Sequence, residues 1–241
     1  MAKPKLLLVD GSSLAFRAFF SILDLNRFKN SNGLHTNALY SFHRMFKSIL
    51  DSEKPTHVLV AWDAGKTTFR TEMYADYKGG RSKTPGEFIE QMPYFNVLLD
   101  AWGIPHYRLN QYEADDIIGT LAKQGEAAGY EVVVLSGDKD LIQLADNNIT
   151  VKITTKGVTE LVEYTPEVIF EKYGLTPEQI IDMKGLMGDS SDNYPGVTKV
   201  GEKTAVKLLQ EFGSVEGIYE HVDEMKKSKL KENLINDKEL A

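Results

Sequence analysis

The 241-residue sequence contains no cysteine, which excludes disulfide bonds and thiolate metal sites. It also lacks an apolar run long enough to cross a bilayer and a charged-then-apolar leader in residues 1–5, so we expect no membrane partner. Its five histidines show no spacing that suits metal binding or acid–base chemistry, and no nucleophile signature such as Gly-x-Ser-x-Gly occurs. These absences predict a protein of the reducing cytoplasm whose chemistry does not depend on thiols or histidines.

The net charge of −7 would by itself argue against a polyanionic partner, but the charge is unevenly distributed. Setting aside the nine carboxylates that are nominated below as metal ligands changes the net charge from −7 to +2. The basic residues gather in three stretches: Lys66, Arg70, Lys78, Arg81 and Lys83; Lys199, Lys203 and Lys207; and Lys226, Lys227, Lys229 and Lys231. The first two stretches favour a nucleic-acid surface around an acidic pocket, whereas the third is more typical of a solvated face.

Three short apolar runs predict buried parallel strands: Leu6–Val9, Val58–Trp62 and Glu131–Leu135. After the first strand, the pattern predicts a helix whose N-cap is Ser12 or Ser13. Helical periodicity predicts three further helices, over Asn37–Leu50, Phe88–Trp102 and Ile117–Ala128. The segments 151–153 and 158–162, on either side of Lys156-Gly157, predict a hairpin. Strand patterns stop after Tyr164, and helix starts at Thr165-Pro166 and Thr176-Pro177 follow, the second with a capping box. We therefore expect an α/β domain over residues 1–164 and a helical region over 165–241.

Each predicted parallel strand is followed by an aspartate: Asp10, Asp63 and Asp138. Because the carboxyl ends of parallel strands face one crevice, we expect these three carboxylates to meet there, with Asp140 two residues further on. Such crowded charges repel one another unless cations lie among them. Oxygen-only ligands select hard ions, so the sequence predicts two Mg²⁺ or Mn²⁺ ions of the kind that assist phosphodiester cleavage.

A further acidic cluster opens the predicted helix that precedes the third strand. Glu113, Asp115 and Asp116 fall within four residues, and Glu113 and Asp116 are one helical turn apart. Acids in the first turn of a helix are common as caps, and this stretch alone would not indicate a site. Its position beside three strand-end aspartates favours the metal-site interpretation.

The Gly-rich stretch 185–205 adds Asp189 and Asp192 and then opens a helix. A P-loop is rejected, because the spacing from Gly201 to Lys203 is one residue too long and no strand precedes it. Backbone amides at such a helix start, with Lys199 and Lys203 adjacent, suit a DNA phosphate. The sequence therefore predicts a hairpin-and-helix grip on DNA.

Residues 64–86 are polar, basic and Gly-rich and show no strong periodicity, so they form a long connection between predicted elements. Connections of this length are usually functional or disordered. The aromatic residues Tyr74 and Tyr77 of this connection have two open interpretations, stacking on an unpaired base or packing within the connection.

These features together resemble the bacterial 5′ nucleases of the flap-endonuclease superfamily, most closely the amino-terminal 5′–3′ exonuclease domain of DNA polymerase I. The motifs that carry the resemblance are Leu8-Val9-Asp10-Gly11, Ala61-Trp62-Asp63, Phe69-Arg70, Tyr77-Lys78-Gly79-Gly80-Arg81, Glu113-Ala114-Asp115-Asp116, Ser136-Gly137-Asp138-Lys139-Asp140, Gly188-Asp189-Ser190-Ser191-Asp192-Asn193, and Pro195-Gly196-Val197 to Thr204-Ala205. They cover almost the whole chain in a fixed order, which makes the resemblance highly specific.

The resemblance implies a PIN-like α/β nuclease core, with a mostly parallel sheet flanked by helices and an arch over about residues 64–100, followed by a helix–hairpin–helix (H3TH) region. It implies one ion held by Asp10, Asp63, Glu113, Asp115 and Asp116, and a second held by Asp138, Asp140, Asp189 and Asp192. It assigns catalytic roles to Lys78, Arg81, Asp10 and Asp115, and DNA contacts to Arg70, Tyr77, Lys78, Arg81, Gly196, Lys199, Gly201, Lys203 and Thr204. It also implies a K⁺ ion at the 196–201 hairpin.

The implied function is structure-specific hydrolysis of DNA at 5′ flaps, nicks and RNA-primer junctions, in replication and repair near the bacterial nucleoid. Relatives of this kind continue past residue 241, so we expect either an excised domain, normally attached to a polymerase, or a short free-standing relative. Two other functions stay open: a PIN-type ribonuclease, which would share the acidic crevice, and a non-catalytic module that binds DNA junctions. The Lys78–Arg81 motif and the 185–205 grip count against the first, and the intact acids count against the second.

Overall fold

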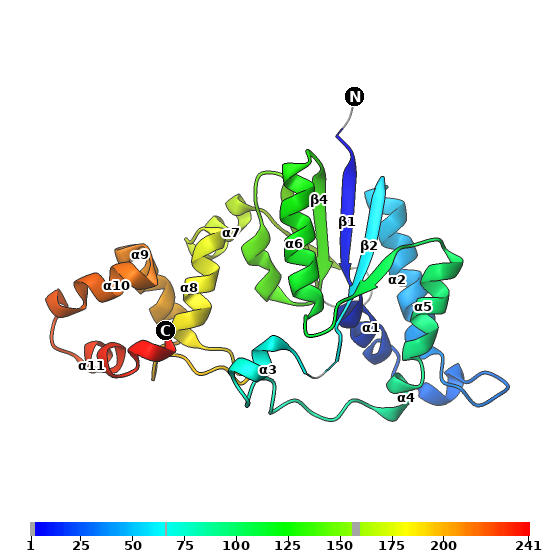
Figure 1. Cartoon of the computed structure of the whole chain (residues 1–241), viewed down its shortest axis with the longest axis horizontal. Coiled ribbons are helices and arrows are strands. Elements are labelled where there is room, and N and C mark those ends of the chain that lie inside the picture. The colour runs from blue at the N-terminus through cyan, green and yellow to red at the C-terminus, as the bar shows by residue number, and fades with distance from the viewer. Residues whose placement is uncertain (1–2, 66, 156–159) are drawn as a thin grey trace. The chain divides into compact units, whose positions relative to one another are not determined.

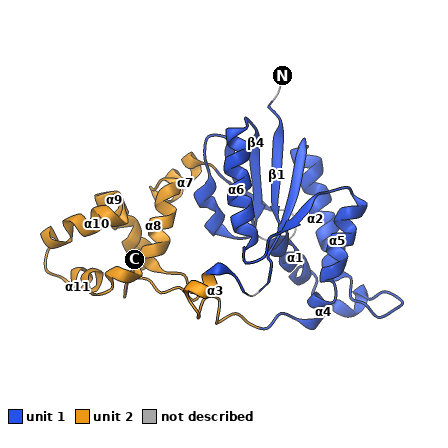
Figure 2. Ribbon diagram, in the orientation of Figure 1, with its two compact units in different colours: residues 1–69, 83–164 blue, residues 70–82, 165–241 orange. Residues whose placement is uncertain are grey.

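The computed structural model describes residues 3–65, 67–155 and 160–241, and it divides into two compact units (Figures 1 and 2). Unit 1 comprises residues 1–69 and 83–164, and unit 2 comprises residues 70–82 and 165–241. The predicted positions of Lys66 and of the Lys156-Gly157 turn lie outside the described residues. In the part of the chain that is described, no helix combines the length and apolarity that a membrane span requires.

Unit 1 is built on one six-stranded sheet in the order β3-β2-β1-β4-β5-β6. The strands are β1 (Lys5–Asp10), β2 (His57–Trp62), β3 (His106–Arg108), β4 (Glu131–Ser136), β5 (Ile149–Thr154) and β6 (Leu161–Tyr164). All neighbouring strands are parallel except β5 and β6, which form the predicted antiparallel hairpin. The predicted mostly parallel α/β sheet is therefore confirmed.

The helices of unit 1 cover both faces of this sheet (Figure 1). They are α1 (Gly11–Phe20), α2 (Asn37–Glu53), α4 (Gly86–Ile89), α5 (Met92–Ala101) and α6 (Ala114–Ala127), with the 3₁₀ turns η1 (Leu25–Phe28) and η2 (Lys139–Leu144). Side chains alternate along β1, so Leu7 and Val9 join the core with α1, α2 and α5. On the opposite face, Gly125 of α6 lies so close to Leu6 that a Cβ atom at position 125 would come within 2.8 Å of it. Burial on both faces explains why the interiors of the central strands β1, β2 and β4 are apolar, whereas β3, β5 and β6 include polar residues.

Two local expectations about unit 1 are wrong. Helix α1 starts at Gly11 with Asp10 as its cap, not at Ser12 or Ser13, because the Asp10 carboxylate accepts the Ser13 amide at 2.9 Å. The predicted helix Phe88–Trp102 is divided into α4 and α5, since Pro93 stands in the first turn of α5 and cannot donate a helical hydrogen bond.

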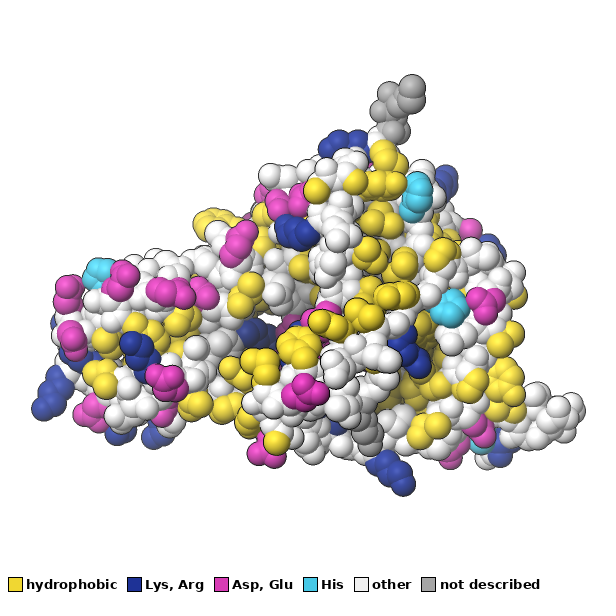
Figure 3. Space-filling view, in the orientation of Figure 1, with side chains coloured by type: hydrophobic (Ala, Val, Ile, Leu, Met, Phe, Trp, Pro, Cys, Tyr) yellow, Lys and Arg dark blue, Asp and Glu magenta, His cyan; other side chains and the backbone are white. Residues whose placement is uncertain are grey.

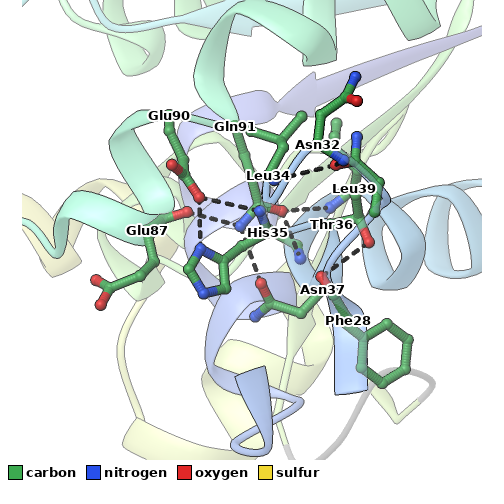
Figure 4. Close-up of polar contacts among 12 residues, drawn as sticks. Phe28, Asn32, Leu34, His35, Thr36, Asn37, Leu39, Glu87, Glu90 and Gln91 are labelled. Carbon is green, nitrogen blue, oxygen red and sulfur yellow. Dashed lines mark hydrogen bonds and ion pairs between the residues drawn. The ribbon is translucent and has the colours of Figure 1, made fainter. Parts of the chain in front are cut away.

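The residue at this break, Gln91, is fully buried and forms the centre of a polar cluster (Figure 4). Its Oε1 accepts the amides of Ala38 and Leu39 at 3.0 and 3.3 Å, and so caps the start of α2. Its Nε2 donates to Asn37 Oδ1 at 2.9 Å and to the Glu87 carbonyl at 2.7 Å. The four bonds fasten the α4–α5 junction to α2 in a site where an unpaired polar group would be costly.

Unit 2 is helical. It contains α7 (Pro166–Tyr173), α8 (Pro177–Met187), α9 (Glu202–Phe212), α10 (Val215–His221) and α11 (Lys229–Asn236), with the 3₁₀ turns η3 (Val222–Glu224) and η4 (Lys238–Leu240). Helix α3 (Phe69–Met73), which lies much earlier in the sequence, also belongs to this unit from Arg70 onward. The predicted caps Thr165 and Thr176 are present, and the capping box of Thr176 with Gln179 is complete. Basic and acidic side chains intermingle over the face of α9, α10 and α11 that Figure 3 displays. Residues 70–82, which the sequence placed with the nuclease core, belong to this unit because they bond to residues 191–193.

Candidate active site

One group of predicted ligands lies in unit 1, at the carboxyl ends of β2, β1 and β4, which are adjacent strands of the sheet. The chain passes from β1 to β2 on one side and later returns to β4 on the other, so β1 and β4 flank the topological switch point. Asp10 ends β1, Asp63 follows β2 directly, and Asp138 follows β4 by two residues. This is the position at which open α/β sheets bind ligands.

Asp10 is the most buried of these acids, with 5% of its surface exposed. Ser136 Oγ donates to its Oδ2 at 2.7 Å, and the Ser13 amide donates to its Oδ1. Burial raises the pKa of Asp10, the two hydrogen bonds lower it, and the charges of Asp63 and Asp138 raise it; the net result is a pKa of about 6. Ionisation of Asp10 is therefore unfavourable in this surrounding, and a bound cation would stabilise the ionised carboxylate.

Asp63 connects the end of β2 to the start of α6. Its Oδ1 accepts the Ala114 amide at 2.9 Å, and its own amide donates to Ser12 Oγ at 3.0 Å. Glu113, which is 6% exposed, caps α6 and forms a reciprocal capping box with Asp116, whose Oδ2 accepts the Glu113 amide at 2.9 Å. Asp115 lies half-buried in the same first turn. The acids at the start of α6 thus cap the helix, and the Asp63–Ala114 hydrogen bond places their negative charges near the carboxyl end of β2.

Asp138 and Asp140 lie at the start of η2. Asp138 Oδ1 accepts the Asp140 amide at 2.9 Å, and the Asp138 amide donates to Ser136 Oγ at 3.0 Å. Ser136 therefore joins Asp10 to the β4 end, a role that the sequence did not reveal because a strand-terminal serine carries no distinctive pattern. Within the described ranges, no three or more acids or histidines are gathered at metal-ligating distances. Several of the carboxylate oxygens point instead to backbone amides.

A separate group of predicted ligands belongs to unit 2, in the turn between α8 and α9. Asp189 and Tyr194 form an antiparallel bridge, with reciprocal backbone bonds of 2.9 and 2.8 Å. Lys184 Nζ lies 2.6 Å from Asp189 Oδ2, and Ser191 donates to Oδ1 through its amide and its hydroxyl. Partial burial raises the pKa of Asp189, but Lys184 and Ser191 outweigh it and bring that pKa to about 2. Lys184 is thus a charge partner that sequence reasoning missed.

Asp192 holds the basic segment 77–81 within the same unit. Arg81 Nη2 lies 2.7 Å from Asp192 Oδ1, and the Tyr77 hydroxyl donates to Oδ2 at 3.0 Å. The Lys78 amide donates to the Asp192 carbonyl at 2.8 Å, while its ammonium lies 5.0 Å from the centre of the Tyr77 ring. Lys78 adopts a left-handed φ of 57° in this turn. Three predicted site residues of the basic motif therefore meet one predicted metal ligand that lies more than 100 positions further along the chain.

Tyr74 packs edge-on against Tyr194, with ring centroids 6.2 Å apart, and stacking of Tyr74 or Tyr77 on an unpaired base stays a prediction. Arg70 lies in α3.

The hairpin, residues 196–201, follows this turn and leads into α9. Gly196 is required by close packing, because a Cβ there would lie 2.2 Å from the Gly188 nitrogen. Gly201 caps α9 in extended geometry, and its carbonyl accepts the amides of Thr204 and Ala205 at 2.9 and 3.0 Å. Lys199 and Lys203 are exposed on either side of this cap. The predicted amide-and-lysine surface is present at the start of an 11-residue helix.

Family models describe this architecture along nearly the whole chain. Residues 5–174 match the N-terminal resolvase-like domain of 5′–3′ exonucleases, and residues 175–241 match the C-terminal SAM fold of the same enzymes. The chain belongs to the 5′–3′ exonuclease family.

Individual members of this family are also similar. The DNA polymerase I of Lactococcus lactis subsp. lactis (strain IL1403) is 63% identical over 242 residues, which cover 99% of this chain and 28% of the relative. The chain thus spans less than a third of the length of that relative. The T5 5′-exonuclease with bound zinc matches with a TM-score of 0.77 and 28% identity, covering 98% of this chain and 86% of that one. The bacteriophage T5 flap endonuclease in a complex with DNA and metal ions matches with a TM-score of 0.76 and 27% identity, covering 98% and 85%.

The family and these structures confirm the predicted resemblance and fold class, with a resolvase-like α/β domain followed by a helical domain of SAM fold. Both T5 structures contain bound metal ions, which is consistent with a nuclease that depends on divalent metal ions.

Proposed function

We propose that this chain is a structure-specific, Mg²⁺-dependent 5′ nuclease that hydrolyses DNA phosphodiesters at 5′ flaps, nicks and RNA-primer junctions in replication and repair. The observation that carries the proposal is the placement of Asp10, Asp63 and Asp138 at the carboxyl ends of three adjacent parallel strands, where burial and like charges raise the pKa of Asp10. Capping hydrogen bonds account for one oxygen of each of these carboxylates, but crowding their charges is unfavourable unless a cation lies among them.

The donor set fits hard divalent ions, because every nominated ligand is a carboxylate and no cysteine is present. We assign one ion to Asp10, Asp63, Glu113, Asp115 and Asp116, and a second to Asp138, Asp140, Asp189 and Asp192. The second assignment rests on the family motifs. When bound, such ions polarise the phosphate and lower the pKa of water that attacks it. Ser136 holds Asp10 in place, and the capping box of α6 fixes where Glu113 and Asp116 lie.

The 70–81 segment would supply cations to the scissile phosphate. Lys78 and Arg81 are the two catalytic cations of this proposal, and Tyr77 and Arg70 contact DNA beside them. The bonds of Tyr77 and Arg81 to Asp192 keep this segment ordered in unit 2, so the cations are held in a defined place before substrate binds.

The hairpin and the start of α9 would bind duplex DNA through its phosphates. The proposed contacts are Gly196, Lys199, Gly201, Lys203 and Thr204. Amides and lysines recognise the backbone and carry no base-reading geometry, so we expect binding to be indifferent to sequence. A K⁺ ion at the backbone carbonyls of residues 196–201 would fit the same surface.

In the full-length protein this chain would be covalently attached to a polymerase, because the L. lactis relative that it matches is a DNA polymerase I more than three times as long. The chain would then act in the bacterial cytoplasm, at the nucleoid.

A labelled 5′-flap duplex, incubated with the protein in Mg²⁺ and in EDTA, tests the proposal. We expect cleavage only in Mg²⁺, with a 5′-phosphate product, and we expect Asp115→Asn to abolish cleavage while retaining flap binding in EDTA. An otherwise identical RNA flap is the control substrate. Preferential cleavage of the RNA would favour the ribonuclease function, and binding without cleavage under any metal would favour the non-catalytic module.

A further inference from the structure

The peptide group of Thr198, in the middle of the exposed hairpin, is held from both sides by the end of α11. Its amide donates to Asp237 Oδ2 at 2.8 Å, and its carbonyl accepts Asn233 Nδ2 at 2.7 Å. Asn233 is buried, with 6% of its surface exposed, and Asp237 caps the carboxyl end of α11. Both bonds lie within unit 2 and join residues that are more than 30 positions apart.

The next residue, Lys199, has a φ of 63°. This left-handed conformation is uncommon for a residue that bears a side chain, and it persists where the surroundings determine it. On one side Thr198 is fixed by α11, and on the other Val200 is buried and donates its amide to the Val197 carbonyl at 3.0 Å. The conformation of Lys199 is therefore set between two anchored neighbours, and one anchor is the pair Asn233 and Asp237.

We propose that Asn233 and Asp237 are positioning residues, which hold the hairpin in the conformation that presents Lys199 and the amides at the start of α9 to the DNA backbone. This inference rests on the proposed function, since it takes the hairpin as a DNA-binding surface. A carboxylate beside that surface repels phosphate, so the charge of Asp237 is a disadvantage there, and its value lies in accepting the Thr198 hydrogen bonds. Hydrogen bonds from Thr198 also lower the pKa of Asp237, because they favour its charged form.

Two variants separate the hydrogen bond from the charge. Asp237→Asn and Asp237→Ala remove the same negative charge, but only asparagine keeps an oxygen that can accept the Thr198 amide. We expect Asp237→Asn to bind a 5′-flap duplex in EDTA as tightly as wild type or more tightly. We expect Asp237→Ala to bind about 5- to 10-fold more weakly, which is the effect of losing one such hydrogen bond. The single-turnover cleavage rate at saturating DNA is expected to stay within about twofold for both.

Hydrogen exchange gives a readout that does not depend on DNA. The Thr198 amide is expected to be protected in wild type and in Asp237→Asn, and to exchange faster in Asp237→Ala. Ser228→Ala is the stability control, because Ser228 caps the start of α11 through the Lys231 amide, at the opposite end of the helix from Asp237. It is expected to destabilise α11 without changing DNA affinity.

Each result has a separate meaning. Equal affinities and equal Thr198 exchange in Asp237→Asn and Asp237→Ala would overturn the positioning role. A loss of affinity in Ser228→Ala as large as that in Asp237→Ala would also overturn it, since general loosening of α11 would then account for both. If replacing Lys199 and Lys203 by alanine leaves DNA binding unchanged, the hairpin is not the DNA surface. The proposed function would fail at that point, while the exchange result would still decide whether Asp237 holds the hairpin.

Discussion

Replacing Asp10 by asparagine is expected to stabilise the metal-free protein while abolishing its nuclease activity. Asparagine keeps an oxygen for the Ser13 amide, and the Ser136 hydroxyl can accept a hydrogen bond from the new NH₂ group. What the substitution removes is a buried negative charge whose pKa is raised from 3.8 to about 6. Because a shift of one pKa unit corresponds to about 1.4 kcal/mol, the gain in unfolding free energy is roughly 3 kcal/mol at most.

The sign of the pH dependence follows from proton binding. Between about pH 4 and pH 6 the folded protein retains a proton on Asp10 that the unfolded chain has released. The wild type therefore loses stability as the pH rises through this window, and the loss is complete above it. We expect the asparagine variant to match wild type near pH 4 and to be more stable at pH 8.

Urea unfolding in EDTA, followed by tryptophan fluorescence, measures this difference in unit 1. The chain's only tryptophans, Trp62 and Trp102, both belong to that unit. Asp146→Asn is a control of opposite sign, because Lys123 lies 2.9 Å from Asp146 and lowers its pKa, so this charge contributes stability above about pH 4. Adding Mg²⁺ is expected to stabilise wild type and not Asp10→Asn. If Asp10→Asn is less stable than wild type at pH 8 in EDTA, the burial of charge at this site does not have the cost argued here.

Three further predictions concern the DNA surface, the chemical step and the buried cluster. Replacing Lys199 and Lys203 by alanine is expected to weaken binding to all duplex sequences alike and to lower the salt slope by about 0.9 per lost phosphate contact; an unchanged slope in a salt titration would remove them from the interface. Lys78→Ala is expected to reduce the single-turnover rate far more than flap affinity, because a cation helps most where charge develops, and equal losses would make Lys78 a docking residue. Gln91→Leu is expected to destabilise unit 1 by about 3 kcal/mol, since it leaves buried groups unpaired, whereas the exposed Gln124→Leu on α6 should unfold at the wild-type urea concentration.

The sequence alone was sufficient to predict features that depend on residues close together in the chain. An unbroken apolar run followed by aspartate predicted β1 and β2 with their terminal acids, because a strand buried on both faces admits few polar residues. Thr176 with Gln179 predicted a capping box that the structure contains, because its two bonds span only three residues. The motifs were specific enough to identify the family for the same reason, since each is a short stretch whose order along the chain can be read directly.

The tertiary structure decided which groups those residues meet. Asp10 caps α1 although serines were expected to, because the end of β1 enters the helix directly and brings its carboxylate to the Ser13 amide. Arg81 lies against Asp192, and Gln91 caps α2, across separations of 111 and more than 50 positions. No local pattern encodes such pairs, because they depend on how packed elements bring distant segments together. The sequence therefore determined which residues carry the charge and the hydrogen-bonding groups, and only the fold determined which of them are buried, paired or held ready for a ligand.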